Sequence, residues 1–305
     1  MKKLLFVFNP QAGKAQIRNK LMDILDIMVR EGYEVTIYPT QAREDALNIV
    51  KLRAGHYDLV VCSGGDGTLD EAVSGLIHSG VSVPLGYIPA GSTNDFANSL
   101  KIPKDMIKAA RIAVGGQKFA CDVGTFNEKP FVYVAAFGIF TAVSYRTRQE
   151  WKNILGHAAY ILEGVKSLPE MTSYYMRVEY NDVVIEDEFI FGMVTNSNSV
   201  GGFQNMTGKN VLLDDGKFEV TLIRRPKNLA ELNEILASLT NLIDNTDLIY
   251  SAKSAQVTVL SEEEVPWTLD GEFGGEVREA DIRNMQRALE IMVRKNFTKN
   301  TLFLE

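Results

Sequence analysis

A glycine-rich turn with the sequence VVCSGGDGTLDEAV carries the first residues whose types and spacing suggest chemistry. Gly64, Gly65 and Gly67 permit positive φ and a close approach of the backbone, and a helix beginning near Thr68 would direct free N–H groups at an anion. Asp66 lies in the middle of this turn, where its carboxylate would repel bound phosphates. A magnesium ion, bound directly or through water, would remove that conflict.

The same turn has a plainer interpretation, because a tight connection between a strand and a helix also uses glycine and a polar N-cap. Asp66 or Thr68 would then cap the helix. This turn alone favours neither interpretation, so the other turns of the chain bear on the choice.

Two further polar turns have a similar composition. NPQAGK contains Gly13 and Lys14, and PAGSTNDFA offers Ser92, Thr93 and Asn94 as hydroxyl and amide donors, although this turn could equally cap the following helix. Three such turns at one edge of a sheet favour a nucleotide site more strongly than any one of them does.

Two acidic clusters stand out in the second half of the chain. In WTLDGEFGG, Asp270 and Glu272 would face one side of an extended segment, although Asp-Gly is also typical of a type I′ hairpin turn. In NVLLDDGKFEV, Asp214, Asp215 and Gly216 form either a turn or an oxygen-rich cation site. Each cluster seen alone favours the turn.

Other chemistries have little support. His56, His78 and His157 are scattered, and the sequence contains no G-x-S-x-G, H-E-x-x-H or GxxxxGK[ST] motif, which argues against nucleophilic hydrolysis and zinc chemistry. The basic runs SYRTRQEWK (144–152) and RRPK (224–227) are typical of solvated faces, with contact to anionic lipid headgroups as the alternative.

The first half of the chain alternates strands and helices. The expected strands are KLLFVF, YEVTIYPT, YDLVVCS and VPLGYIP, and the expected helices span about 16–31, 44–53 and 69–77, with a short one after Thr93. This order predicts a parallel sheet with helices on both faces. Because the carboxyl ends of parallel strands meet at one edge, the polar turns that follow them are expected to lie together.

The second half follows a different pattern. From about Asp122, strand-like runs follow one another, with helical patterns only at about 149–167 and 229–242. EYNDVVIEDE predicts a tight hairpin around Asn181-Asp182. We therefore expect a mostly antiparallel second domain, a β-sandwich or a distorted barrel.

The length of 305 residues suffices for two domains. The change of pattern predicts an α/β domain over 1–121, a β-rich domain over 122–295, and a C-terminal segment over 296–305 that could return to the first domain. The net charge of −7 argues against nucleic acid as the main partner.

The cysteines and apolar runs predict a compartment. Cys62 and Cys121 are too few for a disulfide framework or a structural zinc site, and each follows an apolar run, so we expect buried thiols in a reducing environment. MKKLLFVFNP is too short for a signal peptide, and FVYVAAFGIFTAV is too short to span a bilayer. These features predict a cytoplasmic protein without a transmembrane segment.

Taken in this order, NPQAGK, SGGDGTLDEAV, PAGSTNDFA, LDDGKFEV and LDGE resemble the diacylglycerol kinase catalytic family, and more narrowly its soluble bacterial lipid-kinase branch, which is related to sphingosine and ceramide kinases. GGDGT alone is shared with NAD kinases and phosphofructokinases, but its combination with the later motifs is specific and covers essentially the whole chain. The resemblance implies a phosphofructokinase-like α/β domain that binds nucleotide, a β-rich domain that binds a lipid substrate, and ATP in the cleft between them.

The resemblance also implies the residues of the site. The ATP contacts, with the glycine turn included, are Asn9, Pro10, Gln11, Ala12, Gly13, Thr40, Gly64, Gly65, Asp66, Gly67, Thr68, Leu69, Asp70, Glu71 and Ser92. Glu272 is implied as the base that takes the proton of the lipid hydroxyl group, with Asp270 and Asp66 completing the catalytic set. Asp66 would join an Asp–water–magnesium network.

A second, structural magnesium ion is implied at the LDDG turn, where the carboxylate of Asp215 and the main-chain oxygens of Leu212 and Lys217 would hold it.

The expected function is ATP- and magnesium-dependent phosphoryl transfer to the hydroxyl group of a lipid, with diacylglycerol and phosphatidic acid as substrate and product. One rival is an NAD kinase-like or small-polyol kinase on the same fold, which would need no lipid micelles. Another is a catalytically silent, nucleotide-binding regulator. The resemblance implies peripheral contact with a membrane surface. The sequence leaves open the acceptor lipid, its acyl chains and the oligomeric state, a homodimer included.

Overall fold

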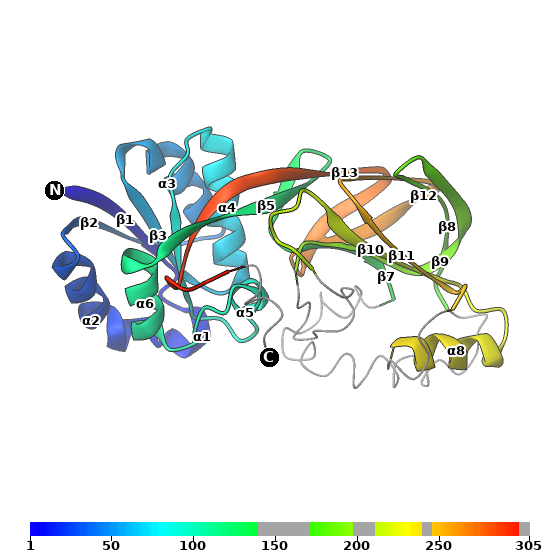
Figure 1. Cartoon of the computed structure of the whole chain (residues 1–305), viewed down its shortest axis with the longest axis horizontal. Coiled ribbons are helices and arrows are strands. Elements are labelled where there is room, and N and C mark those ends of the chain that lie inside the picture. The colour runs from blue at the N-terminus through cyan, green and yellow to red at the C-terminus, as the bar shows by residue number, and fades with distance from the viewer. Residues whose placement is uncertain (140–170, 198–210, 240–245, 299–305) are drawn as a thin grey trace.

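The computed structural model describes residues 1–139, 171–197, 211–239 and 246–298. Figure 1 shows two parts along the long axis of the molecule, an α/β part that contains the N-terminus and a part built mainly of strands.

The α/β part is a parallel sheet with helices around it. Its strands are β1 (Lys2–Phe8), β2 (Tyr33–Pro39), β3 (Leu59–Gly64) and β4 (Leu85–Pro89), and they lie in the order β4-β3-β1-β2. Its helices are α1 (Ala12–Ala15), α2 (Ile17–Arg30), α3 (Asp45–Arg53), the 3₁₀ helix η1 (Ala54–His56), α4 (Asp66–Ser79), α5 (Asp95–Ser99) and α6 (Met106–Gly115). Strands β3 and β4 are buried along their whole length, as expected of central strands covered on both faces. The predicted parallel sheet is confirmed.

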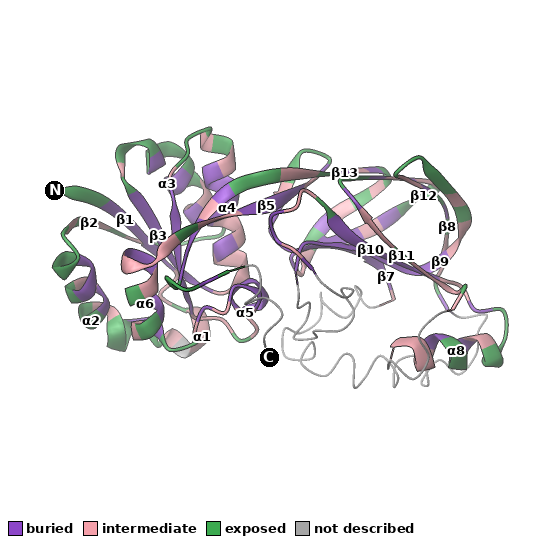
Figure 2. Ribbon diagram, viewed as in Figure 1, coloured by how far each residue is buried: buried purple, intermediate pink, exposed green. Residues whose placement is uncertain are grey.

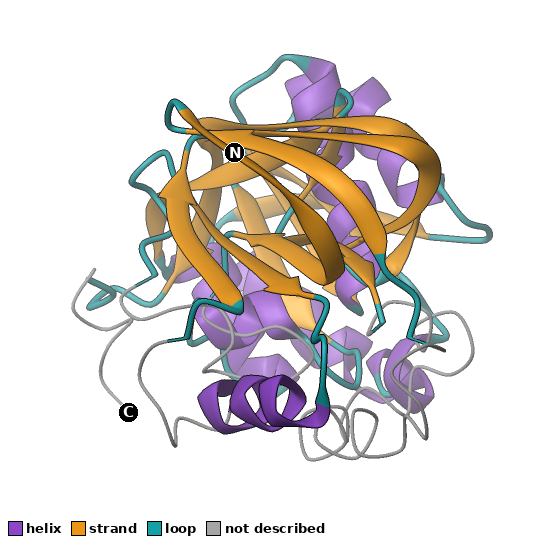
Figure 3. Ribbon diagram, turned by 90° about the vertical axis from the view of Figure 1, so that its right-hand side faces the viewer, coloured by secondary structure: helices purple, strands orange, loops and turns teal. Residues whose placement is uncertain are grey.

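The second part is antiparallel. Its strands are β5 (Gln117–Phe126), β6 (Lys129–Phe131), β7 (Val134–Gly138), β8 (Tyr174–Tyr180), β9 (Val183–Thr195), β10 (Phe218–Arg224), β11 (Ile249–Ser254), β12 (Gln256–Leu269) and β13 (Glu272–Val293), with helix α8 (Leu229–Leu239) below them in Figure 1. Strand β12 pairs with both β7 and β8, and β9 also pairs with both. These four strands therefore close on one another, which favours the distorted barrel of the two expected arrangements (Figure 3).

Strand β13 connects the two parts. It pairs antiparallel with β12 and β5 and then, at Ile291, parallel with Leu85 of β4, so that it crosses from one part to the other in Figure 1. Beyond it, the side chain of Gln117 donates a hydrogen bond to the carbonyl of Phe297 at 2.7 Å. The chain thus returns to the α/β part within β13, while the division at residues 121 and 295 stays a prediction.

The apolar core has two clusters. One joins the helices and sheet of the α/β part and continues along the second part, and the other fills the strand-built part around Trp267, Phe126 and Phe137 (Figure 2). Cys62 and Cys121 are both buried and free, as predicted.

Several local expectations need comment. The hairpin at Asn181-Asp182 is confirmed, and both residues have positive φ (47° and 63°). The runs SAQVTVLSE and VPWTLDGE are not two strands but one, β12, because a register shift between Leu260 and Val265 accommodates the intervening polar residues. The helix expected at about 149–167 and the basic run 144–152 lie outside the described residues.

Candidate active site

A cavity of about 560 Å³ lies where the carboxyl ends of the parallel strands meet the turn between β12 and β13. The loops after β1, β2, β3 and β4 all contribute to its lining, as strand order requires. The residues that line it are Asn9, Gln11, Ala12, Gly13, Thr40, Gln41, Ala42, Arg43, Gly65, Asp66, Gly67, Thr68, Glu71, Gly91, Ser92, Thr93, Asp95, Tyr133, Val134, Asp270, Gly271 and Glu272.

The loop after β3 leads directly into α4. Gly65 is the N-cap and makes no side-chain cap, so Asp66 is the first helical residue; the expectation that Asp66 or Thr68 caps the helix is wrong. Gly64 must be glycine because a Cβ there would collide with the side chain of Thr68. The first turn of a 14-residue helix therefore faces the cavity, which leaves its free N–H groups available to an anion.

The Asp66 carboxylate is held at one oxygen. Its Oδ2 accepts the N–H of Asn94 at 3.0 Å, whereas its buried Oδ1 has no hydrogen-bond partner within the described ranges. Burial, followed by the negative charge of Asp95, raises the pKa of Asp66 to about 7. A carboxylate in this state is suited to a cation.

The loop after β4 is closed by Asn94. Its side-chain amide donates to the carbonyl of Gly91 at 2.8 Å and its Oδ1 accepts the N–H of Gly91 at 2.9 Å. The Asn94 side chain is buried at 2% exposure and shapes the loop, which disfavours the ligand donation that the sequence left open beside helix capping. Ser92 and Thr93 do line the cavity.

The loop after β1 packs against the loop after β4. Gly13 has φ of +54°, and a Cβ at this position would overlap the carbonyl of Ala90. The Asn9 side chain turns toward its own loop, where Oδ1 accepts the N–H of Gln11 at 2.9 Å. Only glycine permits both the backbone conformation and the close approach of the two loops.

The turn between β12 and β13 brings two acids to the cavity. Asp270 and Gly271 both have positive φ (50° and 82°), as a type I′ turn requires, so the extended alternative for this segment is wrong. The carboxylate of Asp270 accepts three backbone N–H groups, from residues 132, 133 and 134, at 2.6, 2.9 and 3.0 Å. Glu272 instead accepts a hydrogen bond from Arg43 at 3.0 Å.

Four of the residues predicted to contact ATP, Pro10, Gly64, Leu69 and Asp70, are not among the described residues that line the cavity. Leu69 belongs to the apolar core. Asp70 lies beneath the cavity, in hydrogen-bonding contact with Asp270. Glu71 reaches the cavity, but its carboxylate also accepts the N–H groups of Glu44 and Ala46 at the start of α3.

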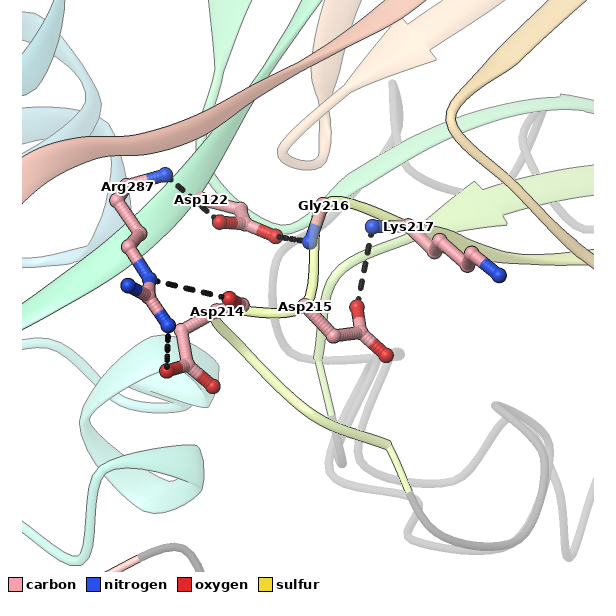
Figure 4. A network of polar contacts seen from close by, with 6 residues as sticks. All are labelled: Asp122, Asp214, Asp215, Gly216, Lys217 and Arg287. Carbon is pink, nitrogen blue, oxygen red and sulfur yellow. Dashed lines mark hydrogen bonds and ion pairs between the residues drawn. The ribbon is translucent and has the colours of Figure 1, made fainter.

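No residue of the LDDG turn is among those that line this cavity, and Figure 4 shows the polar contacts that hold the turn. Asp215 Oδ1 accepts the N–H of Lys217 at 3.0 Å, and Asp214 forms an ion pair with Arg287 at 3.4 Å. Asp122, which is fully buried, accepts the N–H of Gly216 at 2.7 Å and of Arg287 at 2.8 Å.

This network fixes the turn through protein groups. Among the described residues, no group of three or more His, Cys, Asp or Glu side chains is arranged to hold a metal ion. The structural magnesium site at Leu212, Asp215 and Lys217 stays a prediction.

Sequence reasoning missed Arg43, Asp95 and Tyr133 as cavity residues. The first two could have been found, because Arg43 follows the predicted second strand and Asp95 belongs to the STND turn. Tyr133 offered no signal, since it sits in an apolar run typical of a core strand.

Comparisons with known proteins agree with this geometry. Residues 3–126 match the family model described as "Diacylglycerol kinase catalytic domain". The chain is 34% identical over 308 residues to a diacylglycerol kinase of Staphylococcus carnosus, which covers 100% of this chain and 99% of that protein. It is 33% identical to the Staphylococcus haemolyticus diacylglycerol kinase, over 97% and 89% of the two chains.

Solved structures show the same fold. A crystal structure of a diacylglycerol kinase from Bacillus anthracis superposes with a TM-score of 0.75 at 22% identity, over 96% of this chain and 97% of that one. Another structure from the same organism has a TM-score of 0.82 at 22% identity over the same shares.

Proposed function

Because the chain belongs to the diacylglycerol kinase catalytic family and is a lipid kinase, we propose that it transfers the γ-phosphoryl group of ATP to the hydroxyl group of diacylglycerol, giving phosphatidic acid. The observation that carries the proposal is the cavity itself. The N-terminus of α4 lies on one wall, and Glu272 lies on another. One cavity thus holds a site suited to phosphate and a carboxylate suited to taking a proton.

The phosphates of ATP would lie at the start of α4. The backbone N–H group of Gly67 is among those that the helix leaves without intrahelical partners, and the N-terminal end of the helix dipole favours negative charge. The loops after β1 and β4 flank this position with Gly13 and Ser92. Phosphoryl transfer depends chiefly on positioning and on neutralising charge, which this arrangement supplies.

Magnesium fits the environment of Asp66. The buried Oδ1 without a partner among the described residues, together with the raised pKa, describes a carboxylate whose charge lacks compensation. Magnesium is commonly held by one or two carboxylates together with phosphate oxygens and water, so Asp66 is the residue that would hold it. When bound, the ion would offset the negative charge of the phosphates.

Glu272 is the residue that we propose as the general base. Its side chain is 40% exposed at the cavity and is oriented by Arg43. The lipid hydroxyl oxygen would form a bond to the γ-phosphorus while the bond between that phosphorus and the leaving ADP oxygen breaks. The hydroxyl proton passes to Glu272.

The enzyme would reach its lipid at a membrane surface, which the basic runs of the sequence could contact. The structure describes only one of these two runs, RRPK (224–227). In RRPK, Arg224 pairs with Asp187 at 2.6 Å and Arg225 with Glu188 at 2.7 Å, so both charges are compensated within the protein. This favours the solvated-face interpretation for that run. No helix of the described residues is long and apolar enough to cross a membrane.

The test is to incubate the purified protein with ATP, magnesium and mixed micelles that contain diacylglycerol, sphingosine, ceramide or no added lipid. NAD and glycerol serve as soluble acceptors, and release of ADP is measured. We expect ADP release with diacylglycerol micelles alone. Equal release with NAD or glycerol and no lipid would favour the first rival, and ATP binding without acceptor-dependent release would favour the silent regulator.

A further inference from the structure

Two carboxyl groups from the two parts of the chain meet beneath the cavity. Asp70 lies on α4, one turn after Asp66, and its side chain is in hydrogen-bonding contact with that of Asp270 in the turn between β12 and β13. Two ionised carboxylates cannot make such a contact, because neither has a proton to donate. One of the two must therefore carry a proton.

The surroundings of Asp270 favour its ionised form. Both of its oxygens are occupied by donors, since Oδ2 accepts the N–H of Val132 while Oδ1 accepts those of Tyr133 and Val134. Burial raises the pKa of Asp270, but these three N–H groups and the hydrogen bond from Asp70 act in the opposite direction. A proton on Asp270 would have to displace one of these donors.

The surroundings of Asp70 favour its neutral form. The residue as a whole is only partly shielded from solvent, but its carboxyl group is desolvated against Asp270. The charged groups that act on it most strongly are all acidic, namely Asp270 and Glu272 from the turn and Glu71 from its own helix. Tyr133, from the segment before β7, also faces it.

No cation of the described residues is among the groups that act most strongly on Asp70. Arg43 pairs with Glu272, and its charge also acts on Glu71. Burial and the negative charge of Asp270 accordingly raise the pKa of Asp70 well above its ordinary value.

We propose that Asp70 is a positioning residue whose protonated carboxyl group ties α4 to the turn carrying Glu272 by donating its hydrogen bond to Asp270. The helix begins at the loop that lines the proposed phosphate side of the cavity, and Glu272 is two residues beyond Asp270. The bond therefore fixes the spacing between the phosphate side and the base side of the cavity. When Asp70 loses its proton to water as the pH rises, two adjacent negative charges repel and loosen the turn.

The first experiment measures the thermal unfolding midpoint of the full chain against pH, from about pH 3 to about pH 9. Asp70→Asn keeps a donor that cannot titrate, and Asp23→Asn, an exposed acid on α2, controls for the loss of one negative charge. We expect the wild type and Asp70→Asn to agree near pH 3, where Asp70 is protonated in both the folded and the unfolded chain, and the wild type to fall progressively below the variant as the pH rises. Asp23→Asn should follow the wild type.

A difference between wild type and Asp70→Asn that does not change with pH would overturn the proposal. Failure of Asp70→Asn to fold would overturn it too, because an amide donor should fit where a protonated carboxyl group fits.

The second experiment measures kcat against pH for lipid phosphorylation, and this arm rests on the proposed function. Asp70→Ala removes the donor and should lower kcat on the order of tenfold or more through misplacement of Glu272. Asp70→Asn should retain the kcat that Asp70→Ala loses. It should also lack the fall of kcat with rising pH that we expect of the wild type. If Glu272 were not the base, the kinetic arm would fail while the difference in thermal midpoint would persist. If kcat and the thermal midpoint of Asp70→Asn fell with rising pH as much as those of the wild type, the positioning role itself would be contradicted.

Discussion

The guanidinium group of Arg43 lies 3.0 Å from the carboxylate of Glu272, although the two residues are 229 positions apart in the chain. Arg43 belongs to the loop after β2, and Glu272 begins β13, so the pair bridges the two parts of the protein within the lining of the cavity. Both side chains are substantially exposed, at 75% and 40%. The pair is therefore expected to matter for the orientation of Glu272 more than for stability.

Arg43→Ala should leave the thermal midpoint nearly unchanged, because exposed ion pairs contribute at most about 1 kcal/mol. It should lower kcat several-fold, on the order of threefold to tenfold, since Glu272 loses the group that orients it. Arg30→Ala removes an exposed arginine paired with Asp26 on α2 and serves as the control. Equal activity of the two variants would contradict the orienting role.

Asp66→Asn should separate stability from activity. The asparagine keeps an oxygen for the N–H of Asn94 but carries no charge. Because the transition state is then less well stabilised, kcat should fall about 10²-fold or more. The folded-state pKa of Asp66, about 7, lies above its ordinary value of 3.8, so its ionisation costs wild-type stability as pH rises from about 4 to about 7. The variant should therefore unfold at a higher temperature than the wild type at pH 8.

That advantage should disappear near pH 3, where Asp66 is mostly protonated in both the folded and the unfolded chain. A magnesium titration of ADP release should show a much weaker response in the variant. A variant with wild-type turnover and an unaltered magnesium response would contradict the role given to Asp66.

Glu219, which is not among the residues that line the cavity, should make the free energy of unfolding depend on pH. Its side chain is 6% exposed and pairs with Lys253 at 2.8 Å, yet its Oε2 has no hydrogen-bond partner in the part of the chain that the structure describes. Burial raises the pKa of Glu219 from 4.5 to about 7, so the protonated form is favoured in the fold. Stability contributed by that proton is lost as the pH rises from about 4.5 to about 7, by about 3 kcal/mol.

Glu219→Gln should remove this part of the pH dependence, measured by denaturant unfolding between about pH 5 and about pH 8. Glu262→Gln, at an exposed position in β12, should keep it. Identical pH profiles for Glu219→Gln and the wild type would show that burial of Glu219 does not control its protonation.

The sequence could predict what local rules determine. Alternation of strands and helices predicted the parallel sheet, and the rule that strand ends share one edge brought Gly13, Asp66 and Ser92 into one cavity. The glycines of these loops could be predicted as well, because the backbone conformation of a turn and the close approach of its backbone to neighbouring atoms depend on nearby residues.

Contacts between distant segments could not be predicted in this way. The Arg43–Glu272 pair and the Asp70–Asp270 contact depend on how β12 and β13 return to the cavity, and neither residue type indicates its partner. For Asn94 the sequence left ligand donation and helix capping open, and its side chain closes its own loop. Polar side chains in a turn satisfy the nearest backbone groups first, and only the fold shows which of them remain available.

Glu272→Gln tests the central claim most directly. The amide keeps the size of the side chain but cannot take a proton, and Glu276→Gln on the same strand, an exposed residue outside the set that lines the cavity, is the matched control. Diacylglycerol-dependent ADP release is measured together with ATP affinity by calorimetry. We expect turnover below about a hundredth of the wild type, with ATP affinity nearly unchanged and Glu276→Gln fully active. Retention of about a tenth or more of wild-type turnover by Glu272→Gln would contradict the assignment of Glu272 as the base.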